Sequence, residues 1–196
     1  MAGNTVADTQ VPSKDYLDDR SDIDLIAEIN NGDAAAFEVL YFRYRDWVVS
    51  QARRFTGDDN AALDVMQETF LYVLRKFPGF RLTANFKTFL YPAIRNLSIG
   101  ARRKSARYQS TETERNELEN TAGPDAPLGA HEQVDAVLAP LSGEHREVLL
   151  LRFVDGLSLV EIANAMKIPL GTVKSRMHNA LETLRNDPRT RQLFGE

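Results

Sequence analysis

Apolar residues recur every three or four positions along most of this chain, the spacing that puts them on one face of an α-helix. In the first half the spacing predicts four helices, which run from Ser21 or Asp22 to about Asn31, from Asp33 to Gly57, from about Asp59 to Phe77 and from about Asn85 to Arg107. Ser and Asp at the starts and Gly or Pro-Gly at the ends fit the preferences of helix caps. No segment shows a convincing strand alternation, so the sequence predicts an all-α fold.

Each predicted helix is expected to turn its apolar residues inward. In the first two these are Ile23, Ile26 and Ile29, then Phe37, Leu40, Tyr41, Tyr44, Val48 and Phe55, with Trp47 beside them. In the next two they are Leu63, Met66, Phe70, Val73 and Leu74, then Phe86, Leu90, Ala93, Ile94, Leu97 and Ala101. Aromatic side chains bury large apolar areas, so these residues are interpreted as core.

The second half predicts shorter helices. They cover residues 132–138, a run that starts at Ser142 and ends at Asp155-Gly156, a segment that starts at Ser158, and a final helix from Leu170 or Thr172 to about Asn186. Ser158 and Glu161 have the Ser-x-x-Glu spacing of a capping box.

Charge is distributed unevenly, although the 196 residues carry a net charge of only -4. Residues 108–135 hold seven acidic residues against Arg115 alone, together with Gly123-Pro124, Pro127 and Gly129. This composition is typical of a flexible acidic linker. We therefore predict an N-terminal segment (1–21), two small helical domains (22–107 and 131–187) joined by a linker (108–130), and a C-terminal tail (188–196).

Composition also limits the function classes. The chain has no Cys, which excludes a disulfide scaffold, a thiolate metal site and a Cys nucleophile. His131, His145 and His178 are scattered without metal-binding spacing, and no phosphate-binding loop or nucleophile elbow is present. We expect no cofactor, no metal site and no catalysis by this chain. Because no apolar run is long enough to cross a bilayer, we expect no membrane insertion.

Residues 158–185 have the layout of a helix-turn-helix: a short helix, the connection Lys167-Ile168-Pro169, and a longer helix. On a helical wheel, apolar residues of the longer helix fall on one side, whereas Thr172, Ser175 and Asn179 fall opposite, with Lys174 and Arg176 on the flanks. Short polar and cationic groups on an exposed helix can contact base edges and phosphates in the major groove. An ordinary amphipathic helix pair with a solvated outer face would give the same spacing.

A second cationic surface is expected on residues 86–107, which hold six basic residues and no acidic one. Arg95 and Arg102 lie opposite the apolar face, with Asn96 and Arg103 along one edge and Arg107 at the end. Such a face suits a nucleic-acid backbone and exposed bases, and it is also compatible with a solvated helix face.

The sequences of both segments resemble those of bacterial sigma factors of the sigma-70 family. Leu-Ser-Leu-Val-Glu-Ile-Ala (157–163) followed by Gly-Thr-Val-Lys-Ser-Arg-Met (171–177) is similar to their promoter-binding helix-turn-helix. Residues 85–96 followed by the basic cluster resemble the segment that melts and captures the -10 element, and residues 64–71 resemble the preceding helix, which docks on the polymerase clamp. The two-part layout is similar to the extracytoplasmic-function (ECF) group of cytoplasmic bacterial sigma factors.

This resemblance implies partners and site residues. Core RNA polymerase (clamp and flap) would be bound through Asp64, Gln67 and Glu68. The opened -10 strand would be held by Arg95, Asn96, Arg102, Arg103 and Arg107, and the -35 element by Thr172, Lys174, Ser175, Arg176 and Asn179. An anti-sigma factor is a further expected partner.

The chain departs from the family pattern at three positions. Phe89 stands where the family often has Trp, Gly100 stands near an acidic position, and Pro92 interrupts the basic helix with a residue that removes one backbone hydrogen bond. Two alternatives stay open at this point: a sigma-like mimic that captures an anti-sigma factor, and a stand-alone helix-turn-helix regulator.

Overall fold

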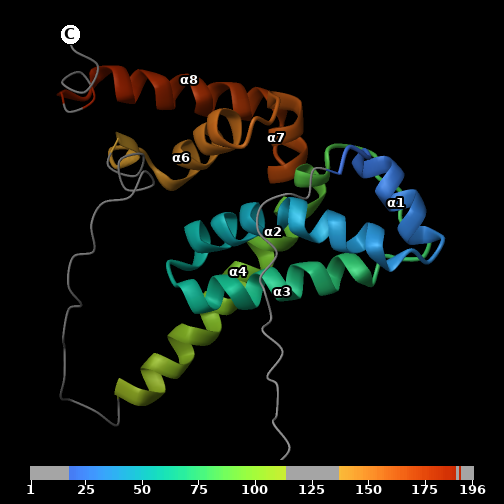
Figure 1. Cartoon of the computed structure of the whole chain (residues 1–196). Coiled ribbons are helices and arrows are strands. Elements are labelled where there is room, and N and C mark those ends of the chain that lie inside the picture. Colours follow the sequence, from blue (N-terminus) through green and yellow to red (C-terminus); the bar gives the residue numbers. More distant parts are fainter. Residues whose placement is uncertain (1–17, 114–136, 189, 191–196) are drawn as a thin grey trace, which may run out of the picture.

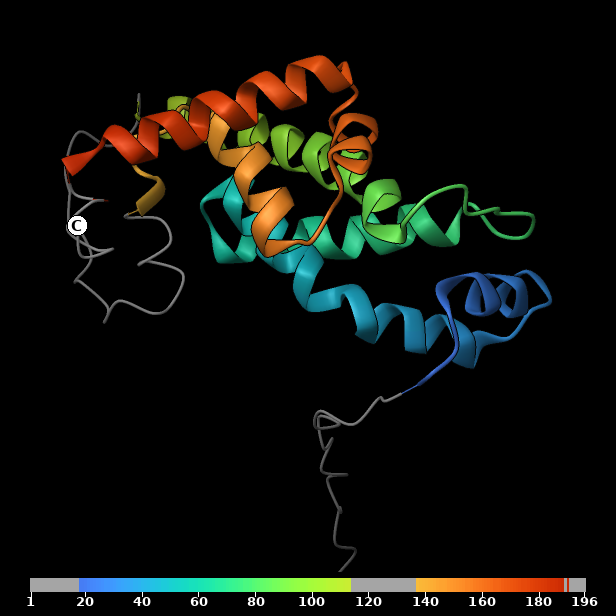
Figure 2. The same cartoon turned by 90° about the horizontal axis from the view of Figure 1, so that it is seen from above.

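The computed structural model describes residues 18–113, 137–188 and 190, with the backbone alone for 106–113. Its first body contains α1 (Asp22–Asn30), α2 (Ala34–Thr56), α3 (Asp59–Leu74) and α4 (Phe86–Thr113). Its second contains α6 (Gly143–Leu149), a π-helical turn η1 (Leu150–Val154), α7 (Leu159–Met166) and α8 (Leu170–Asn186). Figure 1 shows α8 and α7 stacked on one side of the α2–α3–α4 bundle, and Figure 2 shows α1 at its far end. The described residues contain no strand, so the all-α prediction is confirmed for them.

Local sequence signals set most helix ends. Ser21 and Ser158 each form a capping box, with Asp24 and Glu161 as the returning carboxylates. Asp33 accepts hydrogen bonds from two backbone amides at the start of α2, and Gly57 ends that helix in the left-handed conformation. These caps satisfy amide groups that would otherwise have no intrahelical partner.

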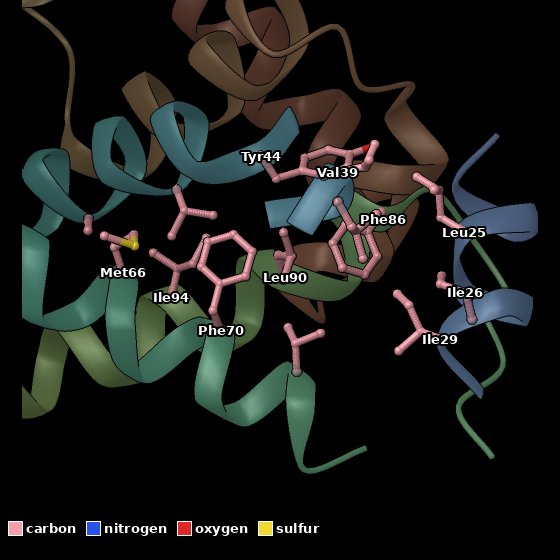
Figure 3. Packing of buried hydrophobic residues seen from close by; sticks show 14 of the residues in the cluster. Leu25, Ile26, Ile29, Val39, Tyr44, Met66, Phe70, Phe86, Leu90 and Ile94 are labelled. Atoms are coloured by element: carbon pink, nitrogen blue, oxygen red, sulfur yellow. The ribbon is translucent and has the colours of Figure 1, made fainter. Parts of the chain in front are cut away.

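The core of the first body lies where α2, α3 and α4 meet, and α1 closes one end (Figure 3). Phe86, Leu90 and Ile94 of α4 are completely buried in the same cluster as Val48 of α2 and Phe70 of α3. Aromatic contacts fix the layers, including an edge-to-face pair of Tyr41 and Phe70 with ring centroids 4.7 Å apart.

Three residues of the first body that were predicted to be core are exposed, and so is Leu181 on the apolar side of α8, at 41%. Ile23 is 67% exposed, and Leu25, which the prediction omitted, is buried in its place. Leu63 and Leu74 of α3 are 45% and 42% exposed. At about 100° per residue, each of the three lies roughly 90–110° around its helix from the centre of the buried side, outside the contact with α2 and α4.

Helix lengths in the first body also differ from the prediction. α3 ends at Leu74, three residues early, and the chain then turns through Phe77 and Phe80, whose rings pack against each other. α4 continues beyond Arg107 to Thr113 and passes through Pro92 without a break. Six residues assigned to the linker are therefore helical.

The segment predicted as one helix from Ser142 to Asp155 has two parts in the structure. Ser142 caps α6, but from Leu150 the backbone widens into η1, where the Asp155 amide donates to the Leu150 carbonyl at 3.0 Å. π-Helical turns are rare and tend to occur at functional sites. This turn buries Leu150 and Leu151 while Phe153 and Val154 project into solvent. The predicted helix over 132–138 falls largely outside the described residues, of which Val137 and Leu138 are helical.

The two bodies pack directly against each other. Tyr91 of α4 is 1% exposed and belongs to the core of the second body, and Trp47 and Phe55 of α2 border the same core. α7 lies along α4 and α8 lies on α6. The sequence predicted two tethered units, and nothing in its periodicity indicated this contact.

Candidate nucleic-acid interface

α8 is built as an amphipathic helix with one free side. Val173, Met177 and Ala180 are buried against α6 and α7. Of the residues predicted to contact a duplex, Lys174, Ser175 and Asn179 are exposed and Thr172 is half-buried. The Ser175 hydroxyl donates to the Thr172 carbonyl at 3.0 Å, so it is folded onto its own helix. The structure thus places these residues on one outward surface, as the wheel predicted.

Arg176 differs from its neighbours because it has an ionic partner. Its Nη2 lies 2.6 Å from Oε2 of Glu144 in α6, and its side chain is only 19% exposed. The guanidinium therefore sits at the edge of the α8 surface with its position fixed by a carboxylate. His178 and Glu182 are 4.0 Å apart on the exposed face and form only a surface pair.

On α4, Asn96 lines a pocket of about 510 Å³ between α3 and α4. Its walls include Tyr72 and Phe89, whose rings are stacked with centroids 5.9 Å apart and an interplanar angle of 21°. Thr88 also lines the pocket, and among the described atoms its buried Oγ1 has no hydrogen-bond partner. Glu68, Arg75 and Lys167 complete the polar rim, so the pocket offers a flat aromatic surface beside several polar groups.

The predicted arginines of α4 do not share one environment. Arg95 Nε lies 3.4 Å from Oε1 of Glu147 in the second body. Arg102 and Arg103 are exposed and line a separate hollow of about 620 Å³ near Thr56 and Asp58. The side chain of Arg107 lies outside the described part of the chain. The structure therefore brings Arg95 and Asn96 close together and sets Arg102 and Arg103 further along the helix.

Asp64, Gln67 and Glu68 are exposed on α3, as predicted from their helical spacing. Leu63, Leu71 and Leu74, each more than 40% exposed, lie on the same helix. Glu68 also lines the Asn96 pocket, so the acidic face and the pocket adjoin.

Sequence reasoning missed a polar cluster at the contact between the two bodies. Asp155, which follows η1, is buried and accepts hydrogen bonds from Trp47 Nε1 at 2.8 Å and from Gln51 Nε2 at 3.0 Å. Arg54 Nη1 lies 3.2 Å from its other oxygen. The sequence predicts only the end of a helix at Asp155-Gly156, and no local signal indicates that the carboxylate is buried against a distant helix.

Within the described ranges, no group of three or more His, Cys, Asp or Glu side chains could hold a metal ion. A search of the same residues finds no helix that is long and apolar enough to span a bilayer.

Comparison with known protein families identifies the family of the chain. The model of sigma-70 region 2 matches residues 40–108, and the model of sigma-70 region 4 matches residues 137–186, so together they cover more than half of the chain. The chain belongs to the sigma-70 family. Relatives that it matches include RNA polymerase sigma factors of the ECF type, and this protein is one as well.

Two of these relatives align over most of their length. The ECF RNA polymerase sigma-E factor of Escherichia coli is 31% identical over 175 residues, which cover 83% of this sigma factor and 91% of the relative. The ECF RNA polymerase sigma factor SigW of Bacillus subtilis is 29% identical over 177 residues, which cover 84% and 95%.

Solved structures support the fold. CnrH, solved in complex with the cytosolic domain of CnrY, aligns with a TM-score of 0.60 at 23% identity and covers 84% of this chain and 94% of that one. The sigma factor RpoE of Bartonella quintana, solved with the anti-sigma factor NepR, gives 0.57 at 24% identity and covers 76% and 94%. The helical fold is thus shared with these two solved structures.

Proposed function

We propose that this sigma factor directs core RNA polymerase to promoters with -10 and -35 elements and that its two bodies divide the work. Residues 22–107 would bind the polymerase and the opened -10 strand, and residues 131–187 would bind the -35 duplex. The regions matched by the two family models, 40–108 and 137–186, lie almost entirely within these two segments.

The observation that carries the -10 assignment is the pocket around Asn96. A flipped base needs a stacking surface and edge hydrogen bonds. Phe89 with Tyr72 supplies the first, and Asn96 supplies the second. Unstacking a base costs a few kcal/mol, and one base stacked on an aromatic ring returns about 1–3 kcal/mol. Arg95, the exposed Arg102 and Arg103, and Arg107 would hold the strand's phosphates in register.

The -35 assignment rests on the outward surface of α8. Lys174, Ser175, Arg176 and Asn179 project from its first three turns, and Thr172 lies at its start. A helix that presents short polar groups and cations at its N-terminal end fits the major groove in this class of motif. Lys174 would contact phosphate, and Arg176 would contact a base edge after leaving Glu144.

For the polymerase, we propose that Asp64, Gln67 and Glu68 contact cationic groups on the clamp. The exposed leucines of α3 beside them add apolar area to this surface, a combination typical of protein interfaces. The second body would contact the flap.

We further propose that an anti-sigma factor holds this protein when it is inactive, because the similar sigma factor RpoE has been solved with the anti-sigma factor NepR. The chain would act in the bacterial cytoplasm, where the polymerase is, and it would need no cofactor and perform no covalent chemistry itself. Family membership disfavours a stand-alone regulator, and the pocket around Asn96 disfavours a mimic that never contacts DNA.

The test is transcription of fragmented genomic DNA by purified core polymerase, with and without this chain, followed by mapping of RNA 5′ ends. We expect a new set of start sites with shared -10 and -35 sequences. Start sites that stay unchanged when the chain is added without an inhibitor would contradict the proposal.

A further inference from the structure

The contact between the two bodies contains a buried carboxylate with a complete set of donors. The side chain of Asp155 is 2% exposed, and its oxygens are bonded by Trp47, Gln51 and Arg54, all on α2. Lys87 of α4 donates to its backbone carbonyl at 3.0 Å and lies over the Trp47 ring at 5.6 Å. All four side chains come from the first body, whereas Asp155 comes from the second.

The free energy of such a buried carboxylate depends on the groups that surround it. A buried charge is tolerated when it is paired and fully hydrogen-bonded, and it is strongly unfavourable when one partner is removed. The single side-chain donor of Trp47 and both carboxylate oxygens of Asp155 are used in the cluster, and Lys87 adds a bond to the Asp155 carbonyl. The cluster is therefore a buried binding site for the carboxylate and not an incidental surface pair.

A second contact in the same interface has similar chemistry. The Tyr91 hydroxyl of α4 donates to Glu147 of α6, and Arg95 lies within ion-pair distance of the same carboxylate. Because Tyr91 is almost completely buried in the core of the second body, separating the bodies would expose that ring.

The closed arrangement also brings the second body to the edge of the site assigned to the -10 strand. Lys167, in the turn of the helix-turn-helix, lines the pocket that contains Asn96, and Arg95 is paired with Glu147. Lys167 is three residues before the start of α8, which places that start within about 11 Å of the pocket rim. Elements named -10 and -35 are separated by about 25 base pairs, or roughly 85 Å of duplex at 3.4 Å per pair.

We propose that the free factor rests in this closed conformer, locked by Asp155 in the Trp47–Gln51–Arg54 cluster, and that it has to open before it can hold both promoter elements. The closing is a property of the chain alone, and its effect on promoters rests on the function proposed above. The group that Trp47, Gln51 and Arg54 bind is therefore the Asp155 carboxylate of the chain's own second body.

The chain itself supplies the probes for a test. Trp47 is its single Trp and lies in the lock, and the absence of Cys allows two unique labels, at Asn60→Cys in α3 and Glu182→Cys in α8. We expect Asp155→Asn to lower energy transfer between the labels and to increase acrylamide quenching of Trp47. The loss of a buried, paired charge should reduce the closing constant at least about 30-fold. The matched control is Asp46→Asn, an exposed aspartate on α2 paired only with its neighbour Arg45 among the described side chains.

Substitution of Asp155 can disturb the second body itself. The Asp155 cluster is therefore also disrupted by substitutions in the first body. Arg54→Ala and Gln51→Ala alter only α2, and each is expected to lower the energy transfer in the same direction. If all three variants keep the transfer of the unsubstituted chain, no lock exists. If only Asp155→Asn changes it, Asp155 acts inside its own body, and the proposal is equally overturned.

A kinetic arm tests the regulatory consequence. Lock variants are expected to associate several-fold faster with core polymerase and to support unchanged transcription at saturating factor, because none of the substituted residues is assigned to polymerase or DNA. Opening without faster association would overturn the regulatory role of the lock. Absence of factor-dependent transcription for every form would count against the proposed function and leave the result on closing intact.

Discussion

Arg176 of α8 and Glu144 of α6 form an ion pair of 2.6 Å at the edge of the surface assigned to the -35 element. The pair makes a sharp prediction. Arg176→Ala should weaken binding of the polymerase holoenzyme to a promoter by about 1–3 kcal/mol if the guanidinium contacts a base, and discrimination at that base should relax. Competition binding with promoter duplexes substituted across the -35 element measures both effects.

The matched control is Glu144→Ala, which breaks the same ion pair and keeps the guanidinium. It should leave promoter affinity unchanged or raise it slightly, because Arg176 no longer has to leave a carboxylate. Equal losses in the two variants would mean that Arg176 only supports the packing of α8 on α6.

Asn96→Ala should impair promoter opening without affecting assembly with polymerase, because the side chain lies in the pocket and not on the acidic face of α3. We expect slower open-complex formation, measured by permanganate reactivity of the -10 thymines, and normal binding of core polymerase. Asn60→Ala, at an exposed asparagine of α3, serves as control. Loss of polymerase binding in Asn96→Ala would show that this part of α4 is misassigned.

Charge reversal on α3 tests the polymerase surface. The double variant Asp64→Arg with Glu68→Arg should weaken binding to core polymerase at least about tenfold, since like charges would then face cationic groups of the clamp. Fluorescence competition against the unsubstituted factor measures the change. The same reversal at the exposed Glu38 and Asp46 of α2 should have little effect, and equal losses in both double variants would reflect net charge alone.

Alkaline pH should destabilise the contact between the bodies. Burial raises the pKa of Tyr91 well above its usual range, and the facing Glu147 carboxylate and Asp155 add to the shift, which Arg95 partly opposes. Because the folded-state pKa is raised, this tyrosine stabilises the fold fully below about pH 10, and that contribution is lost as the pH rises further. Urea unfolding at pH 8 and pH 10.5 should therefore show a loss of stability.

Tyr91→Phe should reduce this alkaline loss. Burial, with Asp22 beside it, also raises the pKa of Tyr44, so Tyr44→Phe should reduce the loss too, and the double variant should reduce it more than either. An alkaline loss that is identical in the unsubstituted and double-variant chains would assign it to other groups.

Much of the fold was determined locally and could be predicted from the sequence. Helix starts at Ser21, Asp33 and Ser158 follow from single side chains that bond the next few amides, and the sequence shows those side chains directly. The outward face of α8 follows from helical periodicity, since residues seven apart, such as Val173 and Ala180, lie on the same buried side.

Helical periodicity did not predict burial correctly where burial depends on which neighbouring helix a residue contacts. Leu63 and Leu74 are as apolar as their buried neighbours, and only the directions of α2 and α4 leave them at the edge of the contact. The widening at η1 was also missed, because a π-helical turn has nearly the same sequence pattern as an α-helix.

The sequence by itself therefore determined the helices, the two basic or polar surfaces and the resemblance on which the family assignment rests, because each depends on residues within a few turns of one another. Only the tertiary structure decided that Asp155 meets Trp47, 108 residues away, and that Lys167 lies beside Asn96. A contact between distant helices depends on how whole surfaces fit together, and a short sequence window contains only one of the two surfaces.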